Sequence, residues 1–182
     1  MEPAFADAAA HSLALVRRYY PGVEAIRALH HRGNSPALAD GAGLVVVASR
    51  ERGAALGLVP RARVLAVANA SVDPVLMLTA GQEAVVKALA RAGLAVADVD
   101  LFEFAEAFAA LCLKFQRDLG VPPERFNVNG GTIAMGHAFG ATGAILTATL
   151  LDELERRGAR IGVVGISGAA GVGSALVVER MS

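Results

Sequence analysis

The sequence has few cysteines, no tryptophan and no surplus of either charge. Its one cysteine, Cys112, excludes a disulfide within the chain and a zinc site built from several cysteines, and it fits the reducing cytoplasm where we expect the protein. The 17 basic side chains balance the 17 acidic ones among 182 residues. Because no basic field is present, neither nucleic acid nor a membrane is an expected partner. No metal motif is visible, and we expect no metal site.

Long hydrophobic runs are also missing. The longest, such as residues 41–48, are far too short to cross a bilayer. Residues 1–16 lack the basic region of a secretory signal, so we expect none. Hydrophobic residues nevertheless make up 54% of the chain and charged residues 19%, which is the composition of a globular protein with a large core.

The hydrophobic pattern predicts an α/β fold. Apolar, β-branched runs predict strands at residues 43–49, 61–71, 98–103, 160–167 and 173–180. Helical spacing predicts helices at residues 49–58, 79–94, 105–120 and 141–158, and one or two more within residues 1–32, interrupted at Pro21-Gly22. Because no helix separates the last two strands, we expect them to form an antiparallel hairpin. We therefore expect an N-terminal helical segment, 1–32, followed by one α/β domain, 33–182.

A single histidine, His137, lies in the glycine-rich segment NGGTIAMGHAFGATG, residues 129–143. A neutral imidazole placed just before a helix can accept a proton from a nucleophile or donate a hydrogen bond to an oxyanion. The glycines around it let backbone approach a ligand closely. The alternative interpretation is a glycine-rich turn whose histidine only caps or packs, and the composition alone does not decide between the two.

Other segments have plainer interpretations when each is taken alone. The loop SGAAGVG, residues 167–173, is either a tight hairpin turn or a set of backbone N–H groups for an oxyanion. Glu106 is interpreted as a first-turn helix residue, and Cys112 as part of a buried helical face rather than as a nucleophile. The remaining histidines have no partners at ligand spacing and are interpreted as surface residues: His11, His30 and His31.

Taken together and in order, five segments resemble the C-terminal half of a thiolase. They are GNSPALADGAG (33–43), VDPVLM (72–77), DVDLFEFAEAFAA (98–110), NVNGGTIAMGHAFGATGA (127–144) and GISGAAGVGSALVVER (165–180). The resemblance implies a five-stranded mixed sheet flanked by helices. It also implies acyl transfer between coenzyme A and 3-oxoacyl-CoA or acetyl-CoA, by thiolysis or Claisen condensation. Coenzyme A and acyl-CoA would be substrates, and no covalently bound cofactor is expected.

The resemblance assigns catalytic roles that this sequence fills only in part. His137 matches the histidine that activates a cysteine nucleophile, although Ala138 follows it where the motif has proline. Ala105 occupies the position of an asparagine or histidine that orients water in an oxyanion hole, so that side-chain hydrogen bond is lost. Ser167 stands at the position of the acid/base cysteine, and a hydroxyl is a far weaker acid than a thiol.

The remaining site residues implied by the resemblance would contact the substrate or coenzyme A. They are Met77, Phe108, Gly136, Gly168 and Ala169, of which Ala169 would offer its backbone N–H to the oxyanion. The half that would carry the nucleophilic cysteine is not part of this sequence. We therefore expect a thiolase N-terminal half as a partner, supplied by a missing segment or a separate subunit, and a homo- or hetero-oligomer.

Two further functions remain open at this point. The losses at Ala105 and Ser167 favour a degenerate thiolase-like module that binds acyl-CoA or a partner without catalysis. The other is a non-canonical thiolase-like lyase that cleaves carbon–carbon bonds with a different set of groups, since some thiolase-like lyases of sterol side-chain degradation lack the usual cysteines. In each case the isolated chain is expected to be inactive as a thiolase.

Overall fold

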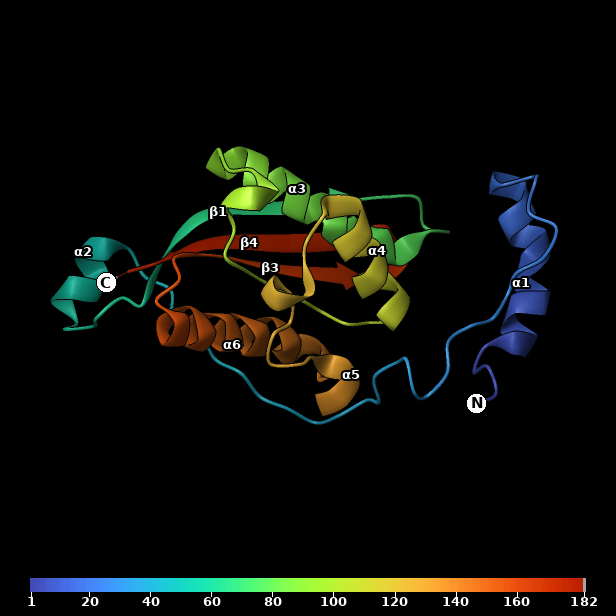
Figure 1. Cartoon of the computed structure of the whole chain (residues 1–182), viewed down its shortest axis with the longest axis horizontal. Helices are drawn as coiled ribbons and strands as arrows, with labels where there is room; N and C mark the ends of the chain where they lie inside the picture. Colours follow the sequence, from blue (N-terminus) through green and yellow to red (C-terminus); the bar gives the residue numbers. More distant parts are fainter. Residues whose placement is uncertain (182) are drawn as a thin grey trace.

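The computed structural model describes residues 1–181 and forms a layered α/β arrangement (Figure 1). A mixed sheet carries helices on both of its faces, which confirms the predicted fold class. The strands are β1 (Ala62–Ser71), β2 (Leu101–Phe104), β3 (Ile161–Gly168) and β4 (Val172–Arg180). The helices are α1 (Ala6–Tyr19), α2 (Arg50–Ala55), α3 (Ala80–Ala92), α4 (Ala109–Leu119), α5 (Thr132–Met135) and α6 (Thr142–Arg157). No helix among the described residues is long and apolar enough to cross a membrane.

The sheet has the strand order β1-β4-β3-β2. Strands β3 and β4 form the predicted antiparallel hairpin, and β4 also pairs antiparallel with β1. Strand β2 pairs parallel with β3, so β1, β2 and β3 all point the same way. Their carboxyl ends therefore meet at one edge of the sheet, which is where α/β proteins usually place a binding site.

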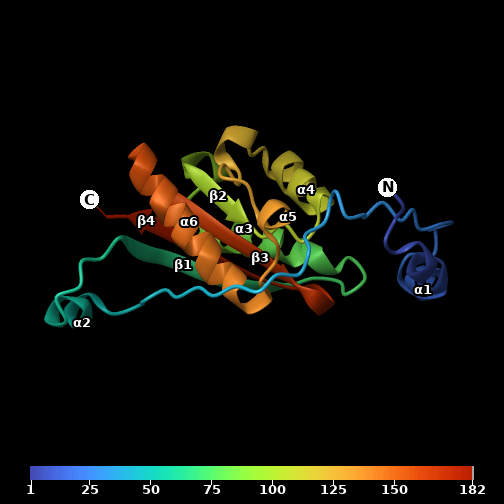
Figure 2. The same cartoon turned by 90° about the horizontal axis from the view of Figure 1, so that it is seen from below.

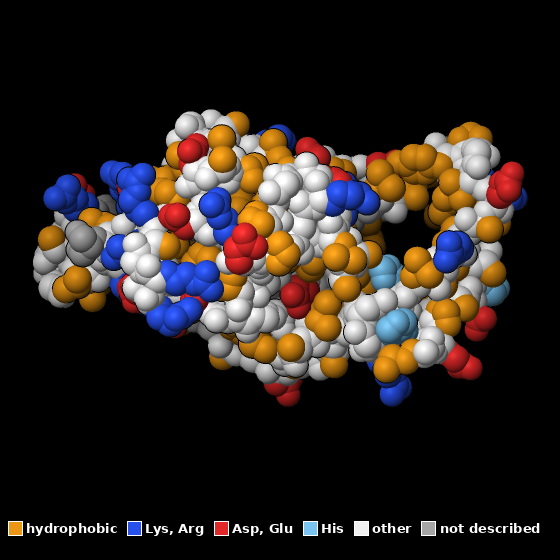
Figure 3. All heavy atoms as spheres, in the orientation of Figure 1, with side chains coloured by type: hydrophobic (Ala, Val, Ile, Leu, Met, Phe, Trp, Pro, Cys, Tyr) orange, Lys and Arg blue, Asp and Glu red, His pale blue; other side chains and the backbone are white. Residues whose placement is uncertain are grey.

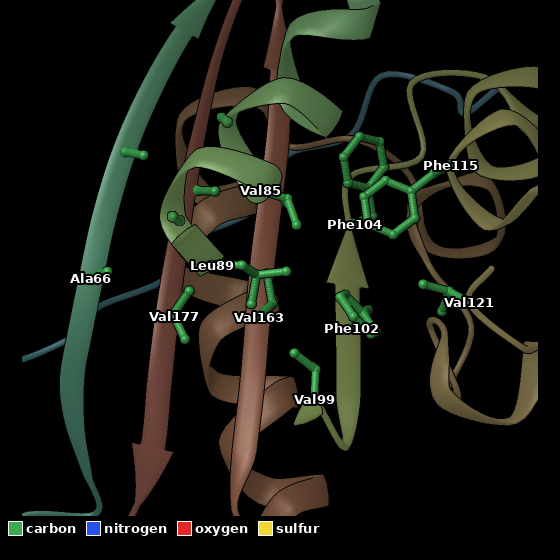
Figure 4. Packing of buried hydrophobic residues seen from close by; sticks show 14 of the residues in the cluster. Ala66, Val85, Leu89, Val99, Phe102, Phe104, Phe115, Val121, Val163 and Val177 are labelled. Atoms are coloured by element: carbon green, nitrogen blue, oxygen red, sulfur yellow. The ribbon is translucent and has the colours of Figure 1, made fainter. Parts of the chain in front are cut away.

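Two apolar clusters lie on opposite faces of the sheet. On one face, Val85 and Leu89 of α3 pack near a group of aromatic side chains from β2 and α4 that includes Phe104 and Phe115 (Figure 4). On the other face, α6 buries its leucines against β2, β3 and β4, and Leu150 is 0% exposed. The helices that the sequence predicts at 79–94 and 141–158 are both present, and they end at the left-handed glycines Gly93 and Gly158.

The strand predicted at residues 43–49 is absent, and that prediction was wrong. Among the described residues, the backbone of 40–48 pairs with no other backbone segment. Val46 is 70% exposed and Val47 is 78% exposed. Figure 2 shows this part of the chain passing α5 and crossing α6 before it reaches α2. The β-branched run favours an extended backbone, but no described strand pairs with it, so the sheet has four strands rather than five.

Gly43 sets how closely this crossing segment approaches α6. A Cβ atom at position 43 would lie 2.8 Å from the Cβ of Ala144 and 3.3 Å from the carbonyl oxygen of Ala141. Real Cβ atoms do not approach other heavy atoms this closely, so the crossing requires glycine. Gly43 therefore lies against the start of α6. Residues 44–48 continue outward from there and are exposed.

The N-terminal segment also differs from its prediction. Only α1 is helical within residues 1–32, and residues 20–32 turn back along it as irregular chain. The hydrogen bond from the Ala4 N–H to the His30 carbonyl closes this turn. Helix α1 has no buried residue, and an opening separates it from the rest of the molecule (Figure 3). Helical spacing after Pro21 predicted a second helix, but α1 offers no buried surface against which such a helix would pack.

Leu150 provides a test of the packing under α6. Replacing it by alanine (Leu150→Ala) should lower the free energy of unfolding by about 2–5 kcal/mol, because it leaves a cavity in a fully buried cluster. Leu113→Ala is the matched control, since Leu113 is 67% exposed on α4, and it should change stability by less than about 0.5 kcal/mol. Urea unfolding followed by circular dichroism measures both, and equal effects would contradict the described packing.

Candidate active site

The residues that the sequence predicts as site residues gather at the carboxyl edge of the sheet. Met77 follows β1, Ala105 and Phe108 follow β2, and Ser167 and Gly168 end β3. The turn Ala169–Gly171 comes next and contacts the loop after β1, where the Val72 N–H donates to the Gly171 carbonyl. The segment with Gly136 and His137 lies between α5 and α6 on the same side, because α6 starts beside Ile166 of β3.

His137 is fixed through its backbone and through one ring nitrogen. Its N–H donates to the Ala37 carbonyl at 2.8 Å, and its carbonyl accepts from the Ala39 N–H at 3.2 Å. The ring nitrogen Nδ1 lies 2.9 Å from Oγ1 of Thr142, the first residue of α6. The half-buried ring therefore has a set orientation, and its second nitrogen has no hydrogen-bond partner among the described residues. An imidazole held in this way can exchange a proton or a hydrogen bond with a bound group.

Ser167 uses its hydroxyl within the fold. Its Oγ donates to the Leu78 carbonyl at 2.6 Å and accepts from the Gly81 N–H at 3.0 Å. The side chain thus ties the end of β3 to the start of α3. Because the Ser167 hydroxyl already donates its hydrogen to Leu78, it can donate to a ligand only if that hydrogen bond breaks.

Ala105 and Phe108 have different surroundings. Ala105 is buried, and its N–H donates to the Gly165 carbonyl at 2.9 Å, so it extends the pairing of β2 with β3 by one residue. Its methyl group offers no polar atom to a water or an oxyanion. Phe108 stacks on the His30 ring with 4.0 Å between the ring centroids. His30 is half-buried by this contact, which corrects its interpretation as a surface residue, whereas His11 is exposed as expected.

Asn127 is a central residue of the site that the sequence did not single out. Its side-chain Oδ1 accepts from the Phe104 N–H at 2.7 Å, and its Nδ2 donates to the Phe104 carbonyl at 2.9 Å. Its own N–H donates to the Phe102 carbonyl. Asn127 thereby satisfies the free edge of β2 where a fifth strand would pair. Its backbone has a φ of +44°, a left-handed conformation that asparagine tolerates better than most residues, so the residue type was the only signal in the sequence.

Glu106 continues this arrangement toward the histidine. Helix α4 starts at Ala109, so Glu106 lies in the preceding loop and its assignment to a first helical turn was wrong. Its Oε1 accepts from Asn127 Nδ2 at 3.0 Å and its Oε2 accepts from the Ile133 N–H at 2.9 Å. The carboxyl group therefore joins the end of β2 to α5, which leads directly to His137.

A small cavity lies beside His137. Its volume is about 90 Å³, and its lining includes Asp40, Met135, Gly136 and Thr142. Sites for small molecules usually enclose about 300–1,000 Å³. The described chain alone therefore forms one wall and a shallow recess rather than an enclosed site for a ligand of that size.

Cys112 of α4 lies within the core. It is 7% exposed and packs in the cluster on the α3 face, which confirms the prediction of a buried residue. Burial, assisted by the negative charge of Glu106, raises the pKa of its thiol to about 12. The thiol is therefore protonated near neutral pH, which disfavours a role as nucleophile. Among residues 1–181, no group of three or more His, Cys, Asp or Glu side chains could hold a metal ion.

Comparisons with known proteins agree with this geometry. The sequence profile described as "Thiolase, C-terminal domain" matches residues 58–180. The chain is 46% identical over 152 residues to the 3-ketoacyl-CoA thiolase of Aeromonas hydrophila subsp. hydrophila, covering 82% of this chain and 39% of that protein. It is 45% identical over 149 residues to the acetyl-CoA acetyltransferase of Allochromatium vinosum, covering 82% of this chain and 38% of that protein.

Solved structures show the same similarity. Human mitochondrial 3-ketoacyl-CoA thiolase in complex with CoA is 37% identical with a TM-score of 0.81, over 83% of this chain and 38% of that one. The acetyl-CoA acetyltransferase of Bacillus anthracis is 37% identical with a TM-score of 0.79, over 82% of this chain and 38% of that one. The chain belongs to the thiolase family and contains its C-terminal domain. It spans less than two fifths of the length of these relatives.

Asn127 provides the test of the site's framework. Asn127→Ala should lower the free energy of unfolding by about 2–4 kcal/mol, because the buried N–H and carbonyl of Phe104 lose their partners. The matched control is Asn69→Ala, since the exposed Asn69 side chain only accepts a hydrogen bond from the exposed Ser174 hydroxyl. We expect the control to stay within about 0.5 kcal/mol of the original chain in urea unfolding. A similar small effect at position 127 would exclude the framework role.

Proposed function

We propose that the chain is the C-terminal part of a thiolase-type acyltransferase that acts on 3-oxoacyl-CoA and acetyl-CoA, with coenzyme A as acyl acceptor or leaving group. The observation that carries the proposal is His137, which is oriented by Thr142 at the carboxyl edge of the sheet and keeps one ring nitrogen free. The names of the relatives support the substrate class. We propose Met77, Phe108, Gly136, Gly168 and Ala169 as substrate or coenzyme A contacts around this histidine.

The proposed chemistry needs a cysteine from the part of the enzyme outside this chain. In thiolysis its thiolate adds to the 3-oxo carbon, the bond between C2 and C3 breaks, and acetyl-CoA leaves after its C2 carbanion takes a proton. The thiolate of coenzyme A then accepts the acyl group from the cysteine. His137 takes the proton of the attacking thiol or donates a hydrogen bond to the oxyanion, the two roles that a neutral imidazole can fill.

Two positions distinguish this chain from a fully equipped thiolase half. Ala105 has no polar side chain for the oxyanion water, and the Ser167 hydroxyl is engaged by Leu78 and Gly81. The proton at C2 would therefore pass through another group of the assembled enzyme. The engaged hydroxyl also favours the second candidate function, a module that binds acyl-CoA or a partner without carrying out acyl transfer.

The exposed segment 44–48 supports an assembled form. Its β-branched side chains and unpaired backbone have the properties of a strand that lacks its sheet. The relatives are more than twice as long as this chain, so we propose that the segment pairs with a sheet edge in the remaining part of the enzyme. Without that part, the same edge favours self-association.

His137 gives the direct test of the acyltransferase. The chain alone should not cleave acetoacetyl-CoA with added coenzyme A, whereas a mixture with a thiolase N-terminal half should. In that mixture His137→Ala should lower kcat/KM by about 100- to 1,000-fold, the usual effect of losing one such group. His11→Ala, on the exposed face of α1, is the control and should leave the rate unchanged. Full activity of His137→Ala would reject the proposal, and binding of acyl-CoA without turnover would support the second candidate.

Segment 44–48 is tested by a charge placed within it. Val46→Lys should weaken association with the N-terminal half, and self-association of the chain alone, because it puts a cation into a buried pairing surface. Val59→Lys is the control, since Val59 is 88% exposed outside this segment. Sedimentation and light scattering measure the species formed. A chain that stays strictly monomeric at high concentration, or a Val46→Lys variant that assembles normally, would contradict this arrangement.

A further inference from the structure

Glu103 is a buried carboxyl group, and one of its oxygens has no hydrogen-bond partner among the described residues. It lies on β2 between Leu101 and Ala105, which belong to the apolar cluster on the α6 face, so its side chain points to that face as well. It is 2% exposed, and its Oε2 has no hydrogen-bond partner among the described residues. An unpaired, ionised carboxylate in such a place is strongly unfavourable.

The charged groups that face Glu103 are themselves acidic. Glu106 lies in the loop after β2, and Glu153 lies on α6. The cations nearby are already engaged, because Arg156 and Arg157 both pair with Glu153. Burial first, and then the charges of Glu106 and Glu153, raise the pKa of Glu103 to about 8. Since the described residues offer no set of metal ligands here, a proton is the group that can neutralise it.

Glu106 connects this buried group to the loop of His137. Both of its oxygens are used, by the Asn127 side chain and by the Ile133 N–H at the start of α5. The Thr132 hydroxyl also donates to the Glu106 carbonyl, and the carboxyl group lies directly on Gly131. A second negative charge at Glu103 would repel Glu106, while Arg156 and Arg157 of the described chain are already paired with Glu153. We expect this repulsion to weaken the contact between the Glu106 carboxylate and the Ile133 N–H.

We propose that Glu103 is held as the uncharged acid in the folded chain, and that this proton keeps Glu106 on α5, which makes Glu103 a positioning residue for His137. Loss of the proton at alkaline pH releases the start of α5 and loosens the histidine loop. The consequence for catalysis rests on the proposed role of His137. The protonation itself is a property of the chain and is measured without turnover, so the two proposals can fail separately.

The first experiment titrates Glu103 in the original chain. Carbon-13 NMR of its side-chain carboxyl should give a midpoint near 8, well above the ordinary value of 4.5. A midpoint near 4.5 would overturn the proposal. The measurement needs no variant, so it does not depend on whether a substitution folds.

The second experiment follows stability against pH. A carboxyl group whose pKa is raised by folding favours the folded state below its unfolded pKa, and this contribution is lost as pH rises through the folded pKa. Between about 4.5 and 8, Glu103 should therefore lower the folding equilibrium constant about tenfold per pH unit. Glu103→Gln should remove this slope, and the exposed control Glu124→Gln should keep it. Parallel curves for all three proteins would contradict a buried acid. If the glutamine variant folds poorly, Glu103→Met replaces it.

The third experiment tests the link to the loop. Hydrogen exchange of the Ile133 amide should speed up above pH 8 by more than the intrinsic tenfold per pH unit, and this excess should disappear in Glu103→Gln. Glu106→Gln should keep Ile133 poorly protected at every pH, because the acceptor itself is weakened. A purely structural Glu103 would leave the exchange of Ile133 unchanged, and that result would reject the positioning role.

Discussion

The rest of the site depends on the two hydrogen bonds between the Asn127 side chain and the backbone of Phe104. Strand β2 is only four residues long and forms the edge of the sheet, so its outer N–H and carbonyl need partners that are not another strand. The amide of Asn127 supplies both, and the same amide then holds Glu106. Because Glu106 binds the start of α5, the position of His137 is connected through two side chains to the end of β2.

The common direction of three strands explains why site residues that are far apart in the sequence meet at one edge of the sheet. Three strands point the same way, and the loops that follow them carry the candidate substrate contacts, while α6 provides Thr142 to orient the histidine. The same arrangement shows what is missing. The recess beside His137 is small and open, and the apolar segment 44–48 faces outward with no partner strand. Both features fit a chain that spans a minor part of its relatives.

Local patterns predicted the elements whose contacts lie within the chain. The closing hairpin followed from two apolar runs joined by small residues, and α3 and α6 followed from helical spacing that ends at Gly93 and Gly158. The strand predicted at residues 43–49 was wrong, because a β-branched run favours an extended backbone without specifying which strand it pairs with. The position of His137 could be predicted from its motif. The contacts of Asn127 and Glu106 could not, because they join residues more than twenty positions apart through side-chain geometry.

The single, buried thiol of the chain has a practical consequence for labelling chemistry. Cys112 is the one thiol of the chain, and burial raises its pKa to about 12, so thiol-directed alkylating reagents meet no reactive thiolate on the folded chain near neutral pH. Any rapid loss of activity after iodoacetamide treatment of an assembly would therefore report on the partner's cysteines alone. This chain can serve as the component without a reactive thiol in such an assembly.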